Sequence, residues 1–307
     1  MAHLVVTRRC NLSCVLCLVY EMDSAPVALP LLIQRIDHLA RLGTVFVTLT
    51  GGEPLLHPDI AEIVSYVRER GMTPAMNSNA FLLDRDKIEA LGSAGLYAMQ
   101  ISVDGVVPND TTVKTLRSLM PKLRLLAEYA SFRIRINTVL GAVAPAEAIE
   151  VAKTAVALGF DAKCSLMRSA SGDSKAIDPE LRRAYDAIRD LGARAPVYLS
   201  ESFQERLLEH GEVDWKCRAG ARTFLVCEKG LVHLCQPRMG DATKPIEDYG
   251  RDDIKRWFHT RKPCASRCPI AFAHQASQFD RHRSQERVED EALGSFVPAR
   301  ALRRHAA

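Results

Sequence analysis

The sequence predicts an α/β fold in which six strand–helix units follow one another and a smaller cysteine-rich segment comes after them. Three observations predict it. Short apolar runs alternate with longer amphipathic stretches from residue 3 to about residue 193, as a parallel βα architecture requires. Polar residues gather where the apolar runs end. Past residue 195 the alternation stops and cysteines become frequent.

Each expected unit pairs a short apolar run with a helical stretch that often opens with Pro or Asp and closes near Gly. The expected strands are 3–8, 44–50, 73–78, 97–103, 132–139 and 160–166. The expected helices are 29–42, 58–70, 85–94, 111–129, 145–157 and 179–192. Six such units can form an incomplete barrel or an open doubly wound sheet, and periodicity alone does not choose. In both folds the chemistry lies beyond the carboxyl ends of the strands.

The last third of the chain has a different pattern. Residues 222–235 predict two strands around a Lys229-Gly230 turn, and an amphipathic segment follows at 251–259. A cysteine pair and a final helix come next. We therefore divide the chain into a core at 1–195, a small module at 196–280 and a charged, solvated tail at 281–307.

Composition excludes several functional classes. With 47% hydrophobic and 25% charged residues, the 307-residue chain is typical of a globular protein. Its 41 Lys and Arg against 37 Asp and Glu are interspersed, so no basic stripe for nucleic acid is present. No run approaches the roughly 18 apolar residues of a membrane span, and the N-terminus lacks the pattern of a signal peptide. We expect a cytoplasmic protein with no nucleic-acid partner and no membrane span.

Three of the nine cysteines lie together near the N-terminus. In a reducing compartment, cysteines are more often metal ligands, catalytic thiols or buried small residues than disulfides. Cys10, Cys14 and Cys17 place three thiolates within eight residues, which suits a compact iron–sulfur cluster with one iron left open. A zinc site is the alternative, but it needs a fourth ligand nearby, and none follows before His57.

The cysteine triplet after the first strand, with Gly51-Gly52-Glu53-Pro54 after the second, resembles the radical S-adenosylmethionine (SAM) superfamily. The resemblance implies a partial (β/α)6 TIM-like barrel. It also implies a 4Fe–4S cluster whose open iron binds SAM, and reductive cleavage of SAM to a 5′-deoxyadenosyl radical. A low-potential electron donor such as flavodoxin or ferredoxin would supply the electron.

The resemblance also suggests which side chains bind SAM. The glycines would let the backbone approach the methionine amino group, which Glu53 or its backbone would receive. Polar strand-end residues match the family's ribose and carboxylate contacts, although each could instead be a cap or turn residue. The cofactor-binding candidates are Gly51, Gly52, Glu53, Pro54, Asn77, Asn79, Ser102, Asp104, Asn137 and Arg168. Leu16 stands where many members carry an aromatic residue against the adenine.

A second cysteine set lies in the module. Cys217, Cys235, Cys264 and Cys268 resemble the ligands of a twitch-type auxiliary module, the truncated form of SPASM, and imply one further 4Fe–4S cluster. A structural zinc site of four thiolates is the alternative. Cys227 and Cys164 are left over. Each is a buried thiol or a hydrogen-atom donor to a substrate radical, and Cys227 could also exchange as a ligand.

The resemblance implies an enzyme that abstracts a hydrogen atom from a small metabolite or a short peptide, ending in oxidation or crosslinking. Nine residues precede Cys10, so we expect no separate N-terminal peptide-recognition domain. A radical epimerase with a cysteine donor and a radical methyl or adenosyl transferase are alternatives. A non-catalytic iron–sulfur scaffold is a further alternative, but a scaffold would not need an open iron.

Overall fold

The computed structural model describes residues 1–14, 17, 21–167, 178–192 and 201–278. The chain forms two compact units. Unit 1 comprises Met1–Met167 and Ile177–Tyr198, and unit 2 comprises Arg168–Ala176 and Leu199–Ala307. Arg168, Leu16 and the expected tail at 281–307 lie outside the described residues. Among the described helices, none combines the length and apolar character needed to cross a membrane.

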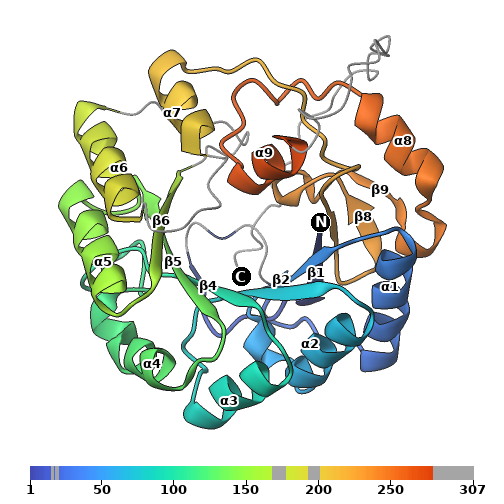
Figure 1. The fold of residues 1–307 in the computed structure, drawn as a ribbon, viewed down its shortest axis with the longest axis horizontal. Helices are drawn as coiled ribbons and strands as arrows, with labels where there is room; N and C mark the ends of the chain where they lie inside the picture. Colours follow the sequence, from blue (N-terminus) through green and yellow to red (C-terminus); the bar gives the residue numbers. More distant parts are fainter. Residues whose placement is uncertain (15–16, 18–20, 168–177, 193–200, 279–307) are drawn as a thin grey trace. The chain divides into compact units, whose positions relative to one another are not determined.

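Unit 1 is a curved parallel sheet with helices on its outer side (Figure 1). Its strands are β1 (Ala2–Thr7), β2 (Phe46–Gly51), β3 (Thr73–Ser78), β4 (Ala98–Ser102), β5 (Arg133–Leu140) and β6 (Asp161–Leu166). Each strand pairs with the next in chain order, and every pair is parallel. A doubly wound sheet would reverse its order at a switch point. The unbroken order confirms the partial (β/α)6 barrel.

The helices of unit 1 are amphipathic and bury one face. They are α1 (Leu29–Arg41), α2 (Ile60–Glu69), α3 (Arg85–Ser93), α4 (Leu116–Tyr129), α5 (Pro145–Ala157) and α6 (Pro179–Gly192). In α1 the buried residues Leu32, Ile36 and Leu39 recur at helical spacing, and a proline stands in its first turn. This periodicity explains why the predicted bounds agree closely with five of these helices.

The start predicted for α4 at residue 111 is wrong, because the helix begins at Leu116. The Asn109 side-chain oxygen accepts hydrogen bonds from the backbone N–H groups of Thr111 and Thr112 at 2.9 and 3.0 Å. This side-chain turn competes with the first helical turn, which is a common property of asparagine. Residues 105–115 are therefore a loop beyond the carboxyl end of β4.

Side chains alternate across β6. Ala162, Cys164 and Leu166 are buried, whereas Lys163 and Ser165 are partly exposed. Helices α5 and α6 pack against this strand. The hydroxyl of Ser165 donates to Asn137 Oδ1 of β5 at 2.7 Å, so the partly exposed faces of the two strands coincide. The alternation assigns Cys164 to the opposite, helix-covered face.

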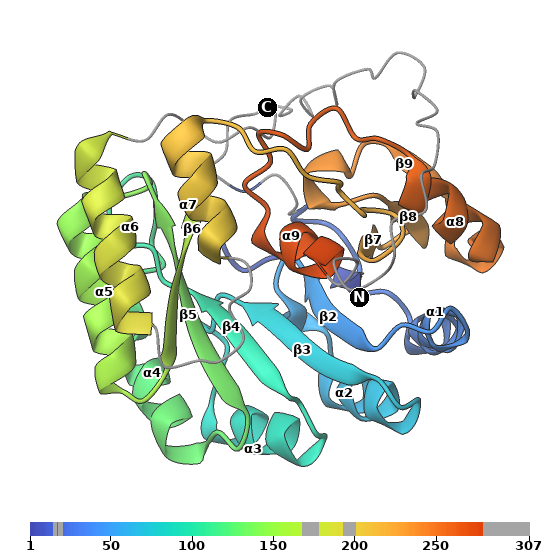
Figure 2. The same cartoon turned by 45° about the horizontal axis from the view of Figure 1, so that its top comes forward.

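Unit 2 is built around short antiparallel strands. Figure 2 shows β8 between β7 and β9, as their pairing requires. Its elements are α7 (Glu201–His210), β7 (Phe224–Val226), β8 (Leu231–His233), η2 (Gln236–Arg238), β9 (Ala242–Pro245), η3 (Ile246–Asp248), α8 (Arg251–His259) and α9 (Ala271–Gln278). The hairpin and α8 agree with the sequence predictions, whereas α7 and β9 were not predicted.

Candidate functional site

Three cysteines of the loop after β1 lie near one another, and Cys17 is among the groups that raise the pKa of both Cys10 and Cys14. Cys10, Cys14 and Cys17 are partly exposed. Burial raises the pKa of Cys10, and the nearby Glu53, Cys17 and Cys14 raise it further. The backbone N–H of Cys17 donates to the Cys14 carbonyl at 3.0 Å and turns the loop back on itself. The loop thus gathers three thiols, which a metal centre would bind as thiolates.

Gly51 and Gly52 let the end of β2 lie against the start of this loop. The N–H of Gly52 donates to the Thr7 carbonyl at 2.9 Å, and that of Glu53 donates to the Arg9 carbonyl at 2.8 Å. A Cβ on Gly51 would lie 1.9 Å from the Thr7 oxygen, and one on Gly52 would lie 2.2 Å from the Arg9 oxygen. Gly51 also has a φ of +152°, which L side chains rarely adopt. These glycines therefore seat the cysteine loop.

Glu53 is buried, and protein groups occupy both of its carboxylate oxygens. Oε1 accepts from the Leu55 N–H at 3.1 Å and from the Ser78 hydroxyl at 2.8 Å. Oε2 accepts from the Asn79 N–H at 2.7 Å. Burial raises the Glu53 pKa, whereas these hydrogen bonds oppose the rise. In this arrangement Glu53 joins the ends of β2 and β3. Pro54 follows it and begins the short helix η1 (Pro54–Leu56).

Asn79 connects the end of β3 to the cysteine loop. Its amide nitrogen donates to Asn11 Oδ1 at 2.8 Å and lies 3.8 Å from Cys10 Sγ. Its amide oxygen accepts from the Phe81 N–H at 3.1 Å. Asn77 lies within β3, where it pairs in register with Gln100 of β4. Of the two asparagines, Asn79 is therefore the one in contact with the loop.

Ser102, the last residue of β4, lies beside Asn137, which the sequence analysis expected near the end of its strand but which lies within β5. They are register partners, and Asn137 is in turn the register partner of Lys163 in β6. Asn137 is 6% exposed, and its side-chain oxygen already accepts from Ser165. The structure thus brings together two of the polar residues that the sequence singled out, on one face of neighbouring strands.

Asp104 forms a buried ion pair with Lys114, a residue that the sequence analysis missed. Asp104 Oδ2 lies 2.8 Å from Lys114 Nζ and accepts from the Thr112 hydroxyl at 3.2 Å. Asp104 Oδ1 is buried and has no hydrogen-bond partner among the described residues. Burial lowers the pKa of Lys114, but Asp104 and the nearby Cys14 and Cys17 raise it by more, so the pKa is raised overall. Lys114 therefore brings a cation to the cysteine loop.

Unit 2 gathers the second cysteine set. Cys217 is buried, and burial raises its pKa to about 11. Burial also raises the pKa of Cys235, and the thiols of Cys268, Cys217 and Cys264 raise it further. The other three expected ligands are thus within electrostatic reach of Cys235. In the described ranges, no three His, Cys, Asp or Glu side chains are positioned around a single metal ion.

Cys227 and Cys164 have packed surroundings. Cys227 is 4% exposed at the β7–β8 turn, where its N–H donates to the Leu231 carbonyl at 3.0 Å. Cys164 is 5% exposed on the helix-covered face of β6. These positions favour buried thiols over hydrogen-atom donors.

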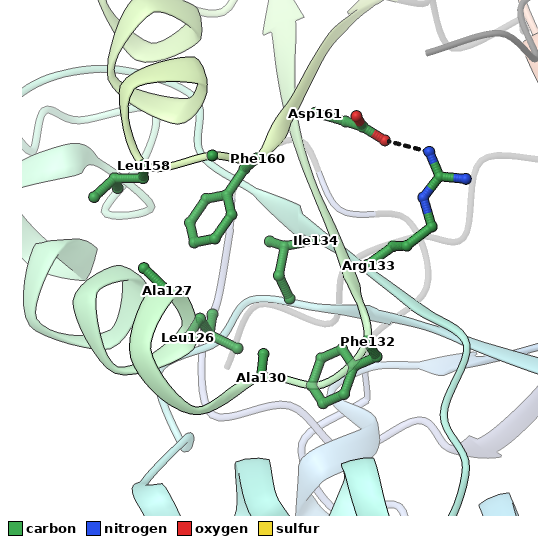
Figure 3. A pocket seen from close by; sticks show the side chains of 10 residues that line it. Leu126, Ala127, Ala130, Phe132, Arg133, Ile134, Leu158, Phe160 and Asp161 are labelled. Carbon is green, nitrogen blue, oxygen red and sulfur yellow. Dashed lines mark hydrogen bonds and ion pairs between the residues drawn. The ribbon is translucent and has the colours of Figure 1, made fainter. Parts of the chain in front are cut away.

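A pocket of about 240 Å³ lies at the opposite ends of the strands of unit 1. Leu126, Phe132 and Phe160 line it, and the Arg133–Asp161 ion pair, with nitrogen and oxygen 3.3 Å apart, stands at its edge (Figure 3). Because Arg133 and Asp161 begin β5 and β6, this pocket is remote from the carboxyl ends of these strands. It is not part of the candidate site.

Residues 4–167 match the family model described as the Radical SAM superfamily, and this match spans more than half of the chain. The chain belongs to the radical SAM superfamily. Members of this superfamily use a 4Fe–4S cluster and SAM. The three soft thiols, partly exposed beside the Lys114 cation, fit a cluster that keeps one iron open to a small molecule.

This radical SAM chain is similar to several characterised proteins. It is 35% identical over 104 residues to Fe-coproporphyrin III synthase of Methanosarcina barkeri, covering 33% of this chain and 26% of the relative. It is 36% identical over 104 residues to PqqA peptide cyclase of Gluconobacter oxydans, covering 33% and 29%. The chain thus matches between a quarter and a third of the length of these relatives.

The fold is similar to that of Streptococcus suis SuiB in a crystal structure of SuiB bound to the precursor peptide SuiA. The TM-score is 0.63 at 17% sequence identity, and the match covers 84% of this chain and 64% of SuiB. At this identity the likeness shows a shared radical SAM fold.

Proposed function

We propose that this radical SAM enzyme cleaves SAM reductively and abstracts a hydrogen atom from a small metabolite or a short peptide. The observation that carries the proposal is the hydrogen-bonded frame around the cysteine loop. Gly52 and Glu53 hold the loop through Thr7 and Arg9, and Asn79 holds it through Asn11. A frame of this kind fixes the thiols in one geometry, which catalysis at a bound cofactor needs.

The bound cluster and SAM would supply the 5′-deoxyadenosyl radical, with an electron from flavodoxin, ferredoxin or a similar donor. Cys10, Cys14 and Cys17 would hold the cluster. Lys114 would offset negative charge beside these thiolates. The polar side chains at the strand ends would position SAM; they are Asn77, Asn79, Ser102, Asp104, Asn137 and, outside the described residues, Arg168. Glu53 would act mainly by fixing Asn79 and Ser78.

Two classes of substrate are compatible with the relatives. The name of PqqA peptide cyclase indicates a peptide substrate, and that of Fe-coproporphyrin III synthase indicates tetrapyrrole chemistry. Each match covers 33% of this chain and less than a third of the relative. Most of each relative's sequence is therefore outside the match. The substrate class therefore stays at a small metabolite or a short peptide.

Anaerobic reconstitution with iron and sulfide, followed by reduction in the presence of SAM, tests the proposal. We expect 5′-deoxyadenosine from the wild type and from the control Cys164→Ala, and none from the triple variant Cys10→Ala, Cys14→Ala, Cys17→Ala. Cleavage retained by the triple variant would contradict the cluster assignment. S-adenosylhomocysteine in place of 5′-deoxyadenosine would indicate a methyl transferase, and no product at all would indicate a scaffold.

We further propose that Cys217, Cys235, Cys264 and Cys268 hold a second 4Fe–4S cluster in a twitch-type module. Support comes from Cys264 and Cys268, which with Cys217 raise the pKa of Cys235, and from Cys264, which also raises the pKa of the buried Cys217. Four protein ligands leave no open iron, which suits electron transfer and a product that is oxidised or crosslinked. The reconstituted protein should then contain about eight irons and eight sulfides. About four irons with one tightly bound zinc would instead establish a structural site.

A further inference from the structure

The side-chain amide of Asn79 is held in one orientation at the end of β3. The backbone N–H of Asn79 donates to Glu53 Oε2 at 2.7 Å, and its side-chain Oδ1 accepts from the Phe81 N–H at 3.1 Å. The reversed amide would place its NH₂ group against the Phe81 N–H, which is also a donor. Asn79 is 8% exposed, so water competes little for these contacts. The NH₂ group of Asn79 therefore faces the cysteine loop.

The two hydrogens of this NH₂ group have two acceptors in the loop. Asn79 Nδ2 donates to Asn11 Oδ1 at 2.8 Å and to Cys10 Sγ at 3.8 Å, a longer distance because sulfur is a larger acceptor than oxygen. In the described part of the chain, no side chain donates to the sulfur of Cys14 or Cys17. An amide hydrogen bond therefore distinguishes Cys10 from the other two thiols.

Binding of Cys10 to iron would strengthen this hydrogen bond. The Cys10 thiol itself donates to Asn11 Oδ1 at 3.9 Å. A cysteine binds iron as a thiolate, which has lost that proton and can only accept. The Asn79 N–H then remains as a donor to the sulfur, whereas the Asn11 oxygen does not. A hydrogen bond to a charged acceptor is about twice as strong as one between neutral groups, and the buried position of Asn79 strengthens it further.

Reduction adds negative charge to an iron–sulfur cluster and its ligands, so a donor at a ligand sulfur stabilises the reduced form more than the oxidised form. We propose that Asn79 is a positioning residue that acts through Cys10 and raises the reduction potential of the cluster held by the cysteine triplet. The inference rests on the proposed cluster and goes beyond the SAM contact expected of the strand-end residues. A higher potential makes this cluster easier to reduce by flavodoxin, ferredoxin or a similar donor.

The test is a redox titration of the reconstituted full chain without SAM, followed by electron paramagnetic resonance. The signal that the triple variant Cys10→Ala, Cys14→Ala, Cys17→Ala lacks is assigned to this cluster. We compare Asn79→Ala with the matched variant Asn11→Ala. Both substitutions break the Asn79–Asn11 hydrogen bond, but only Asn79→Ala removes the N–H that donates to Cys10. Iron and sulfide are counted for every sample.

We expect Asn79→Ala to lower the midpoint potential so that the reduced-to-oxidised ratio at a fixed potential falls at least threefold, or about 28 mV for one electron. Asn11→Ala should keep the midpoint of the wild type. If Asn79→Ala loses iron, Asn79→Ser takes its place, because its hydroxyl can still accept from the Phe81 N–H but supplies no amide donor.

Two kinds of result would overturn the inference, and they are distinguishable. An unchanged midpoint in an Ala or Ser variant with full iron content, or an equal fall in Asn11→Ala, overturns the role of Asn79 and leaves the cluster assignment intact. A triple variant that keeps every cluster signal of the wild type overturns the cluster assignment itself, and with it this inference.

Discussion

The carboxylate of Glu53 accepts three hydrogen bonds. None of the three donor groups is available to accept a hydrogen bond from residue 53. Leu55 and Asn79 present backbone N–H groups, and the Ser78 hydroxyl already accepts from the Ala80 N–H at 2.9 Å. An amide at position 53 would place its NH₂ against a donor in either orientation. The ionised or neutral carboxyl is therefore the group that fits this junction of β2 and β3.

We expect Glu53→Gln to lower the free energy of unfolding by about 1 to 3 kcal/mol, because it leaves a buried donor without an acceptor. Urea unfolding monitored by circular dichroism measures the change. The matched control is Glu89→Gln on α3, where an exposed ion pair with Arg85 is removed and less than about 0.5 kcal/mol is expected. Equal midpoints for the two variants would contradict the role assigned to Glu53.

At this scale the sequence predicted which loop and strand ends form the candidate site, but not the contacts that each residue makes. The motif Gly51 to Pro54 and the cysteine triplet are local in sequence, so both could be recognised from spacing alone. Two of the three hydrogen-bond partners of Glu53, Ser78 and Asn79, are 25 and 26 residues away, and only the folded strand order brings them into contact. Lys114 was missed because the helix expected from residue 111 would have made it an ordinary helical lysine.

At the scale of elements, the contact between the end of β2 and the cysteine loop is made of backbone. We expect Gly52→Ala to cost about 1 to 3 kcal/mol or more, since its Cβ would meet the Arg9 and Arg8 carbonyl oxygens at 2.2 and 2.3 Å. The melting temperature and the iron content should both fall. Gly250→Ala is the control, because no atom lies within 4 Å of its added Cβ. A Gly52→Ala protein with full iron content would show that the loop does not need this close approach.

Strand β1 carries a histidine whose neutral form the fold favours. Burial, followed by the nearby N-terminal amine, lowers the pKa of His3 to about 4. A lowered pKa in the folded state gives stability that is present above the unfolded pKa of about 6.5 and is lost as the pH falls toward 4.

We therefore expect the free energy of unfolding to decrease between pH 6.5 and pH 4, with His3 contributing at most about 3 kcal/mol of that decrease. The variant His3→Gln, which cannot be protonated, should show a shallower decrease over this range. Urea unfolding at several pH values measures both slopes. His38, an exposed-face histidine of α1 that hydrogen-bonds with Arg41, provides the control variant His38→Gln. Identical slopes for His3→Gln and the wild type would assign the acid sensitivity to other groups.

Helices and strands with a clear local pattern of apolar residues could be predicted from the sequence. Elements that lack such a pattern and depend on contacts with distant residues could not. Helix α5 coincides with its prediction at 145–157 because its proline and its apolar spacing are both local. Strand β9 has four residues, Ala242–Pro245, and exists through its pairing with β8. Helix α7 is rich in charged residues and buries Leu207, so its sequence lacked the apolar spacing that marks the other helices.

At the scale of the whole molecule, the two cysteine sets divide between the two units. The order of β1 to β6 settled the choice between barrel and doubly wound sheet, which periodicity left open. In the proposed reaction, the fate of the substrate radical would depend on both sets and on the two remaining thiols. An electron acceptor in unit 2 yields a two-electron-oxidised product, whereas a protonated cysteine that returns a hydrogen atom yields an epimer.

We expect oxidation or crosslinking, because Cys227 and Cys164 are each about 95% covered by packed neighbours and a hydrogen-atom donor must reach the substrate carbon. Once a substrate is found, turnover in deuterated water with the wild type, Cys227→Ala and Cys164→Ala distinguishes the two outcomes. An unlabelled product, two hydrogens lighter than the substrate and formed equally by both variants, would agree with oxidation. Solvent exchange labels a protonated thiol with deuterium before the thiol transfers its hydrogen atom. An epimerase would therefore give a product of unchanged oxidation state that carries one solvent deuterium. The variant that fails to form this product would identify the donor thiol.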